Sequence, residues 1–370
     1  MPEARVIRTI AEAGRERWDS LFPGELETFD YLAAVEHSGV QGFRWRYAIV
    51  EDQGRLLAAA PAFLTEYALE TTLAGAGRRL VGGLRKVFPD ALTLRLACIG
   101  SPVTETSNLG LAANLSPEMQ CDTLRALMGA FEQEARAERC GLFAVKDVPA
   151  PEKALWDRAL RPGGYKPIAG LPVAHIDIDF PDIETYMSRL TYATRKDMRR
   201  KLKVLSQIRI EVRPELGADA DRVLALYQAT RARAEMTFED LPRDYFTGVA
   251  KMMSDRAFYV LYYEGDDLIA ANLLLQNQDL LLDKFFVMDL ERGRPLNLYF
   301  VSWFTNLRLC LERGLKRYVS GQAAYENKLR LGSDLTRTSM YFRHRNAVVN
   351  SAMQLVAPLF AADPTLKAAA

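Results

Sequence analysis

A segment near the start of the chain returns, with changes, in its second half. Tyr47 to Ala60 reads YAIVEDQGRLLAAA and Tyr259 to Asn272 reads YVLYYEGDDLIAAN, and the two align without a gap at an offset of 212 residues. Each segment has two apolar, β-prone runs around a turn with glycine and acidic residues, which is the pattern of a β-hairpin.

A second pair of segments follows in the same order. EARAERCGLFAV (134–145) and LRLCLERGLKRY (307–318) both pass from a helix that ends at glycine into a strand. Elements repeated in a fixed order indicate two copies of one structural unit. The sequence therefore predicts an α/β fold with mixed (α+β) sheets, built as a tandem duplication with one unit in residues 1–180 and the other in residues 181–370.

The composition fits an ordinary globular chain. Of its 370 residues 49% are hydrophobic and 26% are charged, and the net charge of +1 argues against a protein that coats nucleic acid. No run of about 18 apolar residues predicts a membrane span, and the N-terminal segment has no apolar signal core. The four cysteines include no CxxC pair and predict reduced, buried thiols, so we expect a cytoplasmic protein.

Two further regions have a local signature. Pro181 and Asp182 form a helix start signal before a segment with apolar residues on one helical face. Residues 68–92 are rich in glycine and basic residues and predict a loop with a short helix, and residues 366–370 predict a frayed end.

Several common catalytic motifs are absent from the sequence. It contains no GxxxxGK[ST], no GxSxG and no HExxH. Its three histidines, His37, His175 and His344, lie far apart in the chain and predict structural or surface positions. We therefore expect no metal cofactor.

The segment from Leu280 to Arg313 predicts a strand, a turn and a helix. Arg292, Gly293 and Arg294 form the turn, and the helix begins at Asn297. A helix N-terminus offers unpaired N–H groups and the positive end of the helix dipole, so this turn could cradle a pyrophosphate. The alternative is an ordinary turn with solvated arginines.

Polar residues interrupt two apolar strands of the second half. Asp283 and Lys284 lie within one strand, and a buried charge without a partner is costly, so a functional or paired role is expected. Strand alternation points the two side chains to opposite faces. Asn272 and Gln276 share a face of the neighbouring strand, where they could orient an acceptor, and Lys284 could hold a phosphate or carboxylate of a substrate.

A helix near the middle of the chain is strongly basic. Residues 195–203 contain six basic side chains, among them Arg199, Arg200 and Lys203, and a single acidic one, Asp197. One interpretation is a solvated amphipathic helix. The other is a face that binds the phosphates of a nucleotide, of CoA, of a phosphopantetheine carrier or of tRNA.

Three blocks of the second half resemble a known group of enzymes. The strand, glycine-containing turn, helix and strand of residues 280–319 resemble motif A of the GNAT acyltransferase fold. ERGLKRYVSGQAAYENKLRLGS (312–333) resembles the C-terminal block of GNAT-like acyltransferases of polysaccharide and cellulose biosynthesis. LTYATRKDMRRKLKVLSQ (190–207) resembles their basic helix and the equivalent helix of Fem-type peptidoglycan aminoacyltransferases.

The resemblance implies two GNAT-like halves and transfer of an acyl group from a thioester to an amine. The usual pyrophosphate loop has glutamine or arginine where Leu290 stands, and a second small residue where Pro295 stands. Fem-type enzymes, which take their aminoacyl group from tRNA, do not need that loop. The donor is therefore either acyl-CoA or an acyl carrier protein, or else aminoacyl-tRNA.

The resemblance also suggests residues for catalysis. Acyl transfer to an amine needs a base, a donor for the oxyanion and an acid for the leaving group. Glu326 is the first choice for the base, with Tyr325 as the acid and Asp283 as a further catalytic candidate. Gln322 and Lys328, in the same block, are expected to bind substrate.

Three functions follow as hypotheses. The first is a GNAT-like N-acyltransferase acting from a thioester on a small-molecule amine, with the second half catalytic and the first half binding the acceptor or supporting the fold. The second is a Fem-like transferase that depends on aminoacyl-tRNA. The third, of another class, is a catalytically silent module that binds an anion or a protein partner.

Overall fold

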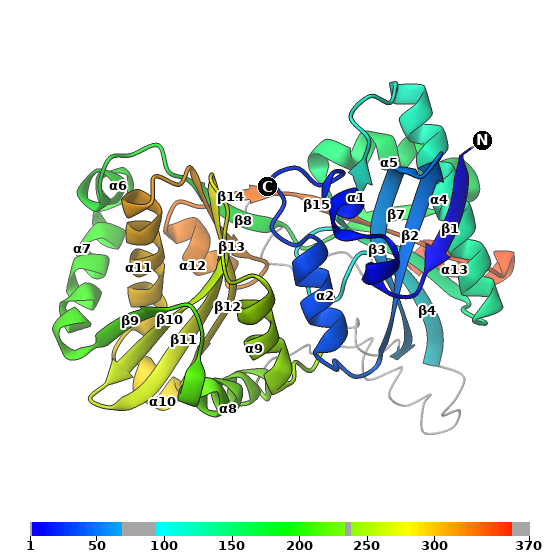
Figure 1. Ribbon diagram of the computed structural model, residues 1–370. Coiled ribbons are helices and arrows are strands. Elements are labelled where there is room, and N and C mark those ends of the chain that lie inside the picture. Colours follow the sequence, from blue (N-terminus) through cyan, green and yellow to red (C-terminus); the bar gives the residue numbers. More distant parts are fainter. Residues whose placement is uncertain (1, 69–92, 234–237, 357–370) are drawn as a thin grey trace.

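The computed structural model describes residues 2–68, 93–233 and 238–356 (Figure 1). The strands form two sheets, one in each half of the molecule. The predicted loop at 68–92, apart from its first residue, and the predicted frayed end lie outside the described residues.

Each sheet is mixed, with one parallel pair of strands near its centre. In spatial order the first sheet contains β1 (Glu3–Ile7), β2 (Phe43–Asp52), β3 (Arg55–Ala68), β4 (Thr93–Ile99), β6 (Leu142–Pro149), β15 (Thr338–His344) and β7 (Lys166–Ala169), with β5 (Gly110–Leu111) paired to β3. The second contains β9 (Arg209–Arg213), β10 (Ala257–Glu264), β11 (Asp267–Gln276), β12 (Leu280–Met288), β13 (Arg317–Gly321), β8 (Val173–Asp177) and β14 (Asp334–Thr336).

The two hairpins repeat each other residue by residue. Tyr47 pairs with Pro61 in the β2–β3 hairpin, and Tyr259 pairs with Leu273 in the β10–β11 hairpin, so the offset of 212 residues holds for both strands. The register shifts at the same place in each, after Val50 and after Tyr262. The predicted duplication is thus confirmed at the level of strand register.

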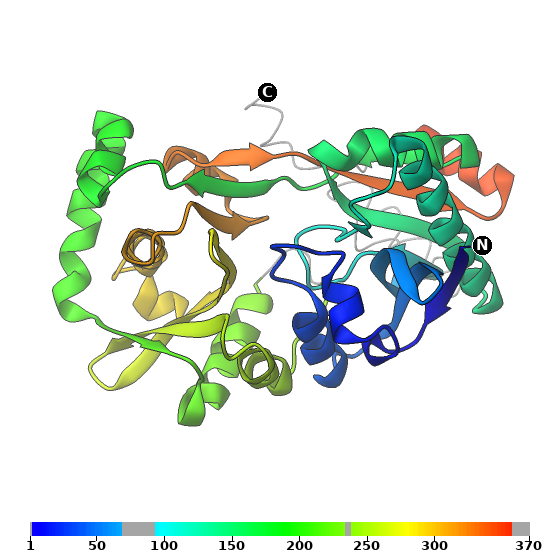
Figure 2. The same ribbon diagram turned by 45° about the horizontal axis from the view of Figure 1, so that its top comes forward.

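The halves exchange one strand each. β7 and β8 follow each other in the chain, but β8 joins the second sheet between β13 and β14. β14 and β15 also follow each other, and β15 returns to the first sheet between β6 and β7. Figure 2 shows both segments passing between the halves. The domain boundary at residue 180 remains a prediction, and the sheets interlock across it.

The crossing of the two exchanged segments is tight. Gly170, between β7 and β8, bonds through its N–H to the carbonyl of Thr338 at 3.1 Å. A Cβ at Gly170 would overlap Oγ1 of Thr338, so only glycine fits here without displacing the neighbouring strand.

Helices cover both faces of the second sheet and most of the first (Figure 1). They are α1 (Arg15–Asp19), α2 (Phe29–His37), α4 (Pro117–Ala137), α5 (Lys153–Leu160), α6 (Ile183–Arg189), α7 (Tyr192–Lys201), α8 (Ala220–Arg231), α9 (Arg243–Met252), α10 (Leu290–Gly293), α11 (Leu298–Glu312), α12 (Tyr325–Arg330) and α13 (Ala347–Val356). Short 3-10 turns lie at Ile10–Glu12, Ala150–Glu152, Arg161–Gly163, Leu202–Gln207 and Gly217–Asp219. None of the described helices is long and apolar enough to cross a bilayer.

The apolar cores show how the layers are arranged. α4 and α5 pack on one face of the first sheet, and α6, α7 and α11 pack on one face of the second. The core on the other face of the second sheet, under α8 and α9, also contains Tyr31 and Val35 of α2. One apolar core is therefore shared by the two halves.

Local signals set the helices that border the site. The predicted start signal before α6 is confirmed, because Oδ1 of Asp182 accepts a hydrogen bond of 2.7 Å from the N–H of Thr185. Thr191 caps α7 in the same way through the N–H of Thr194. The predicted basic helix is α7, which tightens into a 3-10 turn after Lys201.

Candidate active site

The candidate site lies where two parallel strands of the second sheet stop pairing. β12 and β13 pair only from Leu280 and Arg317 to Leu282 and Val319, although β12 continues to Met288 and β13 to Gly321. Beyond these residues the two strands form no backbone ladder within the described part of the chain. We call this region, which begins at Asp283 and Ser320, the β12–β13 opening.

A bulge on β12 separates two neighbouring charges. Leu273 of β11 pairs with Phe285 and Leu274 pairs with Asp283, so Lys284 is an extra residue on β12. Asp283 bonds to side chains of α11 and β13, whereas Lys284 bonds to the first half of the chain. The prediction that the two side chains point to opposite faces is confirmed.

Three donors converge on the Asp283 carboxylate. Asn272 Nδ2 donates to Oδ1 at 2.9 Å, while Asn306 Nδ2 and the Tyr318 hydroxyl donate to Oδ2 at 3.1 and 2.9 Å. The donors belong to β11, α11 and β13 respectively, so the carboxylate joins three elements around the opening.

The orientation of the Asn272 amide is fixed by two hydroxyl groups. Tyr262 and Ser302 donate to its Oδ1 at 3.0 and 2.9 Å. Because the amide oxygen is occupied in this way, the amide nitrogen faces Asp283, and the carboxylate oxygen opposite it is an acceptor.

Burial gives Asp283 an unusual affinity for protons. It raises the pKa of Asp283 to about 6, against the hydrogen bonds from Asn272 and Tyr318 that favour the carboxylate. The residue still keeps part of its surface accessible. A carboxyl group with this pKa is ionised at neutral pH but takes up a proton more readily than an ordinary aspartate, which suits a general base.

Lys328 of α12 lies on the β13 side of the opening. Its ammonium group donates to the carbonyls of Ser320 and Gly321 at 2.5 and 3.1 Å. Burial lowers the pKa of Lys328 to about 8, although the carboxylates of Asp283 and Glu105 favour the charged form. The opening therefore combines a carboxylate with a cation that can release its proton.

Lys284 joins β12 to the first half. Its ammonium lies 2.5 Å from Oε1 of Glu27 and 3.6 Å from Oε1 of Glu105, and 5.3 Å from the centre of the Tyr31 ring. Burial disfavours its charge, but the two carboxylates outweigh burial and raise the pKa of Lys284. Because only 2% of this side chain is exposed, the chain's own carboxylate occupies the place that we expected for a substrate anion.

The turn after β12 is closed on itself. The N–H groups of Glu291 and Arg292 bond to the Asp289 carboxylate, and those of Gly293 and Arg294 bond to carbonyls of the same turn. Arg292 forms ion pairs with Glu264 and Asp267, and Arg294 is exposed.

The two remaining residues of the predicted cradle serve packing and turn geometry. A Cβ at Gly293 would lie 3.0 Å from Sδ of Met288, so glycine allows the turn to pack on β12. Asn297 adopts the left-handed conformation and bonds to the carbonyl of Pro295.

The predicted basic face of α7 is exposed, and part of its charge is paired. Arg199 bonds to Glu184 at 2.8 Å and Arg200 bonds to Asp197 at 2.6 Å. Asp197 also accepts from Arg330 of α12 at 2.8 Å, so α7 is attached to the helix that carries Lys328. Lys203 is exposed on the 3-10 turn that follows.

The other predicted residues are distributed around the opening. Glu326 is exposed in the first turn of α12, and the Tyr325 hydroxyl donates to the carbonyl of Pro172 at 2.8 Å. Gln322 donates to the carbonyls of Leu171 and Glu105 at 2.8 and 3.3 Å.

Gln276 lies apart from the opening. It accepts from Arg313 at the C-terminal end of α11, whereas Asn272 contacts Ser302 in the first turns of that helix. The structure therefore places Asn272 with Asp283, and Gln276 at the far end of α11.

The corresponding place in the first half is filled. β4 and β6 pair in parallel as far as Ile99 and Val145, so Gly100 and Lys146 are the first residues past this ladder, as Asp283 and Ser320 are in the second half. A Cβ at Gly100 would lie 2.6 Å from Cγ of Lys146, whose ammonium bonds to the carbonyl of Ser101 at 2.9 Å. The first half thus has a lysine packed where the second half has a carboxylate.

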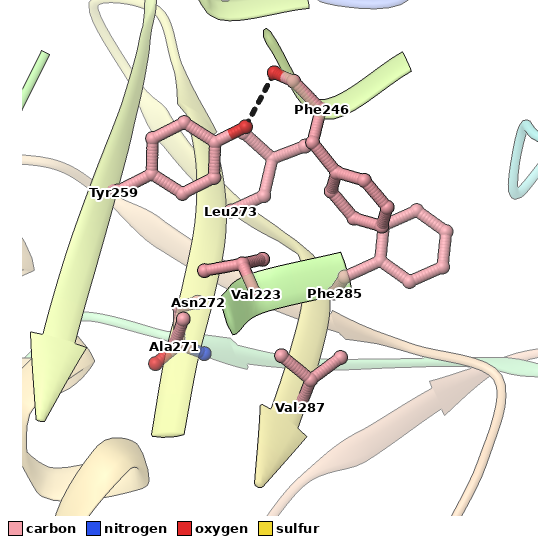
Figure 3. Close-up of a pocket in the computed structure, with 8 residues that line it drawn as sticks. All are labelled: Val223, Phe246, Tyr259, Ala271, Asn272, Leu273, Phe285 and Val287. Carbon is pink, nitrogen blue, oxygen red and sulfur yellow. Dashed lines mark hydrogen bonds between the residues drawn. The ribbon is translucent and has the colours of Figure 1, made fainter. Parts of the chain in front are cut away.

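A hollow on the opposite face of β11 and β12 is packed rather than open. Figure 3 shows the rings of Phe246 and Phe285 side by side, with Val223 of α8 near them and the Tyr259 hydroxyl bonded to the carbonyl of Phe246. The hollow has no room for a water molecule. We therefore place the site at the β12–β13 opening and not in this hollow.

Sequence reasoning missed the residues that surround Asp283. Ser302 and Asn306 are four residues apart in an otherwise apolar helix, so their position on one helix face was a usable signal. Glu27 and Glu105 lie 257 and 179 residues from Lys284, and no local pattern predicts contacts at such distances.

Comparisons with known proteins agree with this architecture. FemX has the same fold with a TM-score of 0.60 at 13% identity, over 96% of this chain and 100% of FemX. The tandem GNAT protein of the clavulanic acid biosynthesis pathway gives a TM-score of 0.54 at 12% identity, over 94% and 99% of the two chains. L-PGS from Bacillus licheniformis gives 0.54 at 10% identity, over 94% and 97%. The predicted fold of two GNAT-like halves is confirmed.

Sequence comparison adds one relative and one family. A protein of Mycobacterium tuberculosis, provisionally named 8-amino-7-oxononanoate synthase 2, is 24% identical over 336 residues, which are 88% of this chain. The match spans 43% of that relative's length. Residues 115–356, more than half of the chain, match the FemAB-like family model, whose description is peptidoglycan biosynthesis/recognition.

Proposed function

Since this chain belongs to the FemAB-like family and is an acyltransferase, we propose that it transfers an acyl group to an amine at the β12–β13 opening. The observation that carries the proposal is the Asp283 carboxyl, which has a pKa of about 6 and is held by donors from three elements. The filled counterpart at Gly100 and Lys146 supports assigning catalysis to the second half.

The reaction begins with a proton transfer to Asp283. The acceptor arrives as an ammonium ion, gives a proton to the carboxylate, and attacks the acyl carbonyl as a neutral amine. A C–N bond forms while the C–S bond of a thioester, or the C–O bond of an ester, breaks. The attacking nitrogen gives up its second proton as the tetrahedral intermediate collapses, the leaving thiolate or alkoxide takes up a proton, and the product is an amide.

Lys328 is the cation of this mechanism. The carbonyl oxygen becomes negative in the tetrahedral intermediate, and a positive group at the opening stabilises that charge. Its pKa of about 8 also allows Lys328 to pass a proton to the leaving group near neutral pH. We assign the base to Asp283 rather than to Glu326, because Glu326 is exposed. We do not assign Tyr325 as the acid, because its hydroxyl is bonded to the carbonyl of Pro172.

The donor is either a thioester or aminoacyl-tRNA. The turn after β12 uses its N–H groups for Asp289 and its own carbonyls, so it offers a pyrophosphate little beyond the exposed Arg294. A CoA thioester would therefore need other contacts, and an acyl carrier protein would present its thioester from outside. Aminoacyl-tRNA is the second candidate, favoured by the exposed basic face of α7. Acyl-CoA, acyl carrier protein and aminoacyl-tRNA are all made in the cytoplasm, where we expect the reaction.

A transfer assay with three donors tests the proposal. The purified chain is incubated with acetyl-CoA, with an acetylated carrier protein or with bulk aminoacyl-tRNA, each with a panel of primary amines, and amide formation is followed by mass spectrometry. We expect Asp283→Asn to lower the rate at least about 100-fold. The matched control is Asp279→Asn at the exposed turn before β12, where the side chain pairs with exposed Lys316.

Each outcome has a definite meaning. Amide formation from one donor, lost in Asp283→Asn and kept in Asp279→Asn, supports the proposal and identifies the donor. Equal rates in the two variants would refute Asp283 as the base. If no donor yields an amide although the wild-type chain binds one of them, the silent binding module is the better description.

A further inference from the structure

Glu105 of the first half reaches the opening of the second half. It lies in the loop between β4 and β5, and its Oε1 is 3.6 Å from the Lys284 ammonium. Its carbonyl accepts from Gln322 at 3.3 Å, and its N–H donates to Glu27 at 3.4 Å. About a fifth of the Glu105 side chain remains exposed, so the carboxylate is fixed on one side and open on the other.

Glu105 comes close to β13 at Gly321. Gly321 has φ of +77°, and a Cβ there would lie 3.5 Å from both carboxylate oxygens of Glu105. The carbonyl of the same glycine accepts from Lys328. The Glu105 carboxylate and the Lys328 ammonium thus both lie beside Gly321, at the end of β13 where the opening begins.

The charges around Glu105 do not balance. Its carboxylate interacts electrostatically with Lys328, Lys284, Lys146, Asp283, Glu27 and Glu239. Asp147, paired with Lys146 at 2.9 Å, completes this group. The group contains five carboxylates and three ammonium groups, and burial raises the pKa of Asp283, Glu27 and Glu239, so a further cation would stabilise their ionised forms.

A buried acceptor beside Asp283 also lacks a donor. The amide nitrogen of Asn306 bonds to Asp283 and Tyr318, but its amide oxygen has no hydrogen-bond partner within the described part of the chain. Asn306 is fully buried, and a buried acceptor without a donor is costly. The excess of carboxylates favours a cation at the opening, and this oxygen favours a hydrogen-bond donor.

We propose that Glu105 determines acceptor specificity, by binding the ammonium group of a cationic amine that enters the β12–β13 opening and carries no anionic group near that amine. This inference rests on the proposed function only for the acyl transfer to the bound amine. Binding of the amine by Glu105 needs no acyl donor. Glu105 would hold the ammonium at the edge of the opening, beside Lys284. Asp283, the residue before Lys284 on β12, would take its proton.

The same geometry disfavours an anionic acceptor. A phosphate or carboxylate beside Glu105 would meet a like charge, and like charges in a partly buried site repel strongly. Lys284 does not compensate, because its ammonium is already paired with Glu27 and only 2% of its side chain is exposed. The acceptor is therefore a cationic amine without a nearby anionic group, such as a diamine, rather than a nucleotide-linked or phosphorylated amine.

A matched pair of small probes tests this inference by binding alone. The probes are 1,5-diaminopentane and 5-aminopentanoate, which have the same length and differ in one end group. Calorimetric titration of the full chain without any donor should show tighter binding of the diamine by at least about 10-fold. Glu105→Gln should remove most of that preference, and Glu105→Asp, which keeps the charge, should retain part of it.

The control and the kinetic readout separate specificity from fold stability. Asp122→Asn removes an exposed carboxylate of α4 that pairs with exposed Arg125, and should change neither affinity. With an active donor, Glu105→Gln should raise KM for the diamine at least about 10-fold and change kcat much less. A purely structural role would lower kcat and melting temperature together.

Failure of this inference differs from failure of the proposed function. Equal or tighter binding of 5-aminopentanoate, or an unchanged preference in Glu105→Gln, overturns the inference even if amide formation is observed. Binding of the diamine that depends on Glu105, with no amide formed from any donor, supports the inference and refutes the proposed transfer.

Discussion

The hydroxyl of Tyr318 on β13 donates a hydrogen bond of 2.9 Å to Oδ2 of Asp283 on β12, just past the last residues that the two strands pair through their backbones. A side-chain bond therefore continues the connection where the parallel ladder ends. It also links the ionisation of Asp283 to the geometry of the opening, because the donor stabilises the carboxylate over the acid.

Replacing that donor should shift the proton affinity of the base. In Tyr318→Phe the carboxylate loses a bond that lowers the pKa of Asp283, so its pKa should rise by about one unit. The acidic limb of kcat/KM against pH should move to higher pH by the same amount. Tyr259→Phe is the control, since its hydroxyl bonds to Phe246 on the other face. An unshifted limb in Tyr318→Phe would contradict the assignment.

The pH profile of the wild-type enzyme should be bell-shaped. The pKa of about 6 for Asp283 means that activity rises as pH increases through 6, because the base must be ionised. The pKa of about 8 for Lys328 means that activity falls as pH increases through 8, because the cation is lost. Steady-state kcat/KM between pH 5 and 9 measures both limbs. A flat profile across pH 6 would exclude Asp283 as the titrating base.

The pair between the halves should contribute to stability. Lys284→Met leaves Glu27 buried without its partner, which should lower the free energy of unfolding by about 3 kcal/mol. Urea titration measures this change. Lys316→Met, at an ion pair whose side chains are 77% and 60% exposed, should cost less than about 1 kcal/mol.

A double variant separates the buried charge from lost packing. Adding Glu27→Gln to Lys284→Met removes the uncompensated carboxylate, so the double variant should be more stable than Lys284→Met alone. If it is less stable by the sum of the two single effects, the pair does not act as a unit and the interpretation is wrong.

The tRNA hypothesis makes a prediction about salt. Changing Lys196, Arg199 and Lys203 to glutamine removes three exposed cations of the α7 region. If these side chains contact phosphates, the slope of log affinity for tRNA against log salt should fall by about 2 to 3. Filter binding between 50 and 200 mM salt measures this slope. Arg95→Gln and Arg125→Gln in the first half are controls, and a slope unchanged in the triple variant would exclude this face.

The fold could be predicted from the sequence because its signals are local and repeated. The hairpin at 47–60 and its copy at 259–272 share turn residues and apolar runs, and the register confirms the copy. The exchange of β8 and β15 has no such signal, since either strand would fit the same position in its own sheet.

The site could be predicted only in part. Asp283 and Lys284 were recognisable as charges in an apolar strand, and both have partners. The pyrophosphate cradle was expected from the turn motif, but whether N–H groups are free depends on Asp289, whose side chain folds back onto them. The role of Glu105 depends on how the two halves pack, which no pattern in one strand or turn contains.

The exchanged strands have a mechanical consequence. β8 and β14 pair side by side where the chain passes between the halves in both directions, and Gly170 presses against Thr338 at the same crossing. Pulling the halves apart would strip a strand from each sheet. The exchanged strands therefore oppose separation of the halves, in addition to the apolar core and the Lys284–Glu27 pair that the halves share.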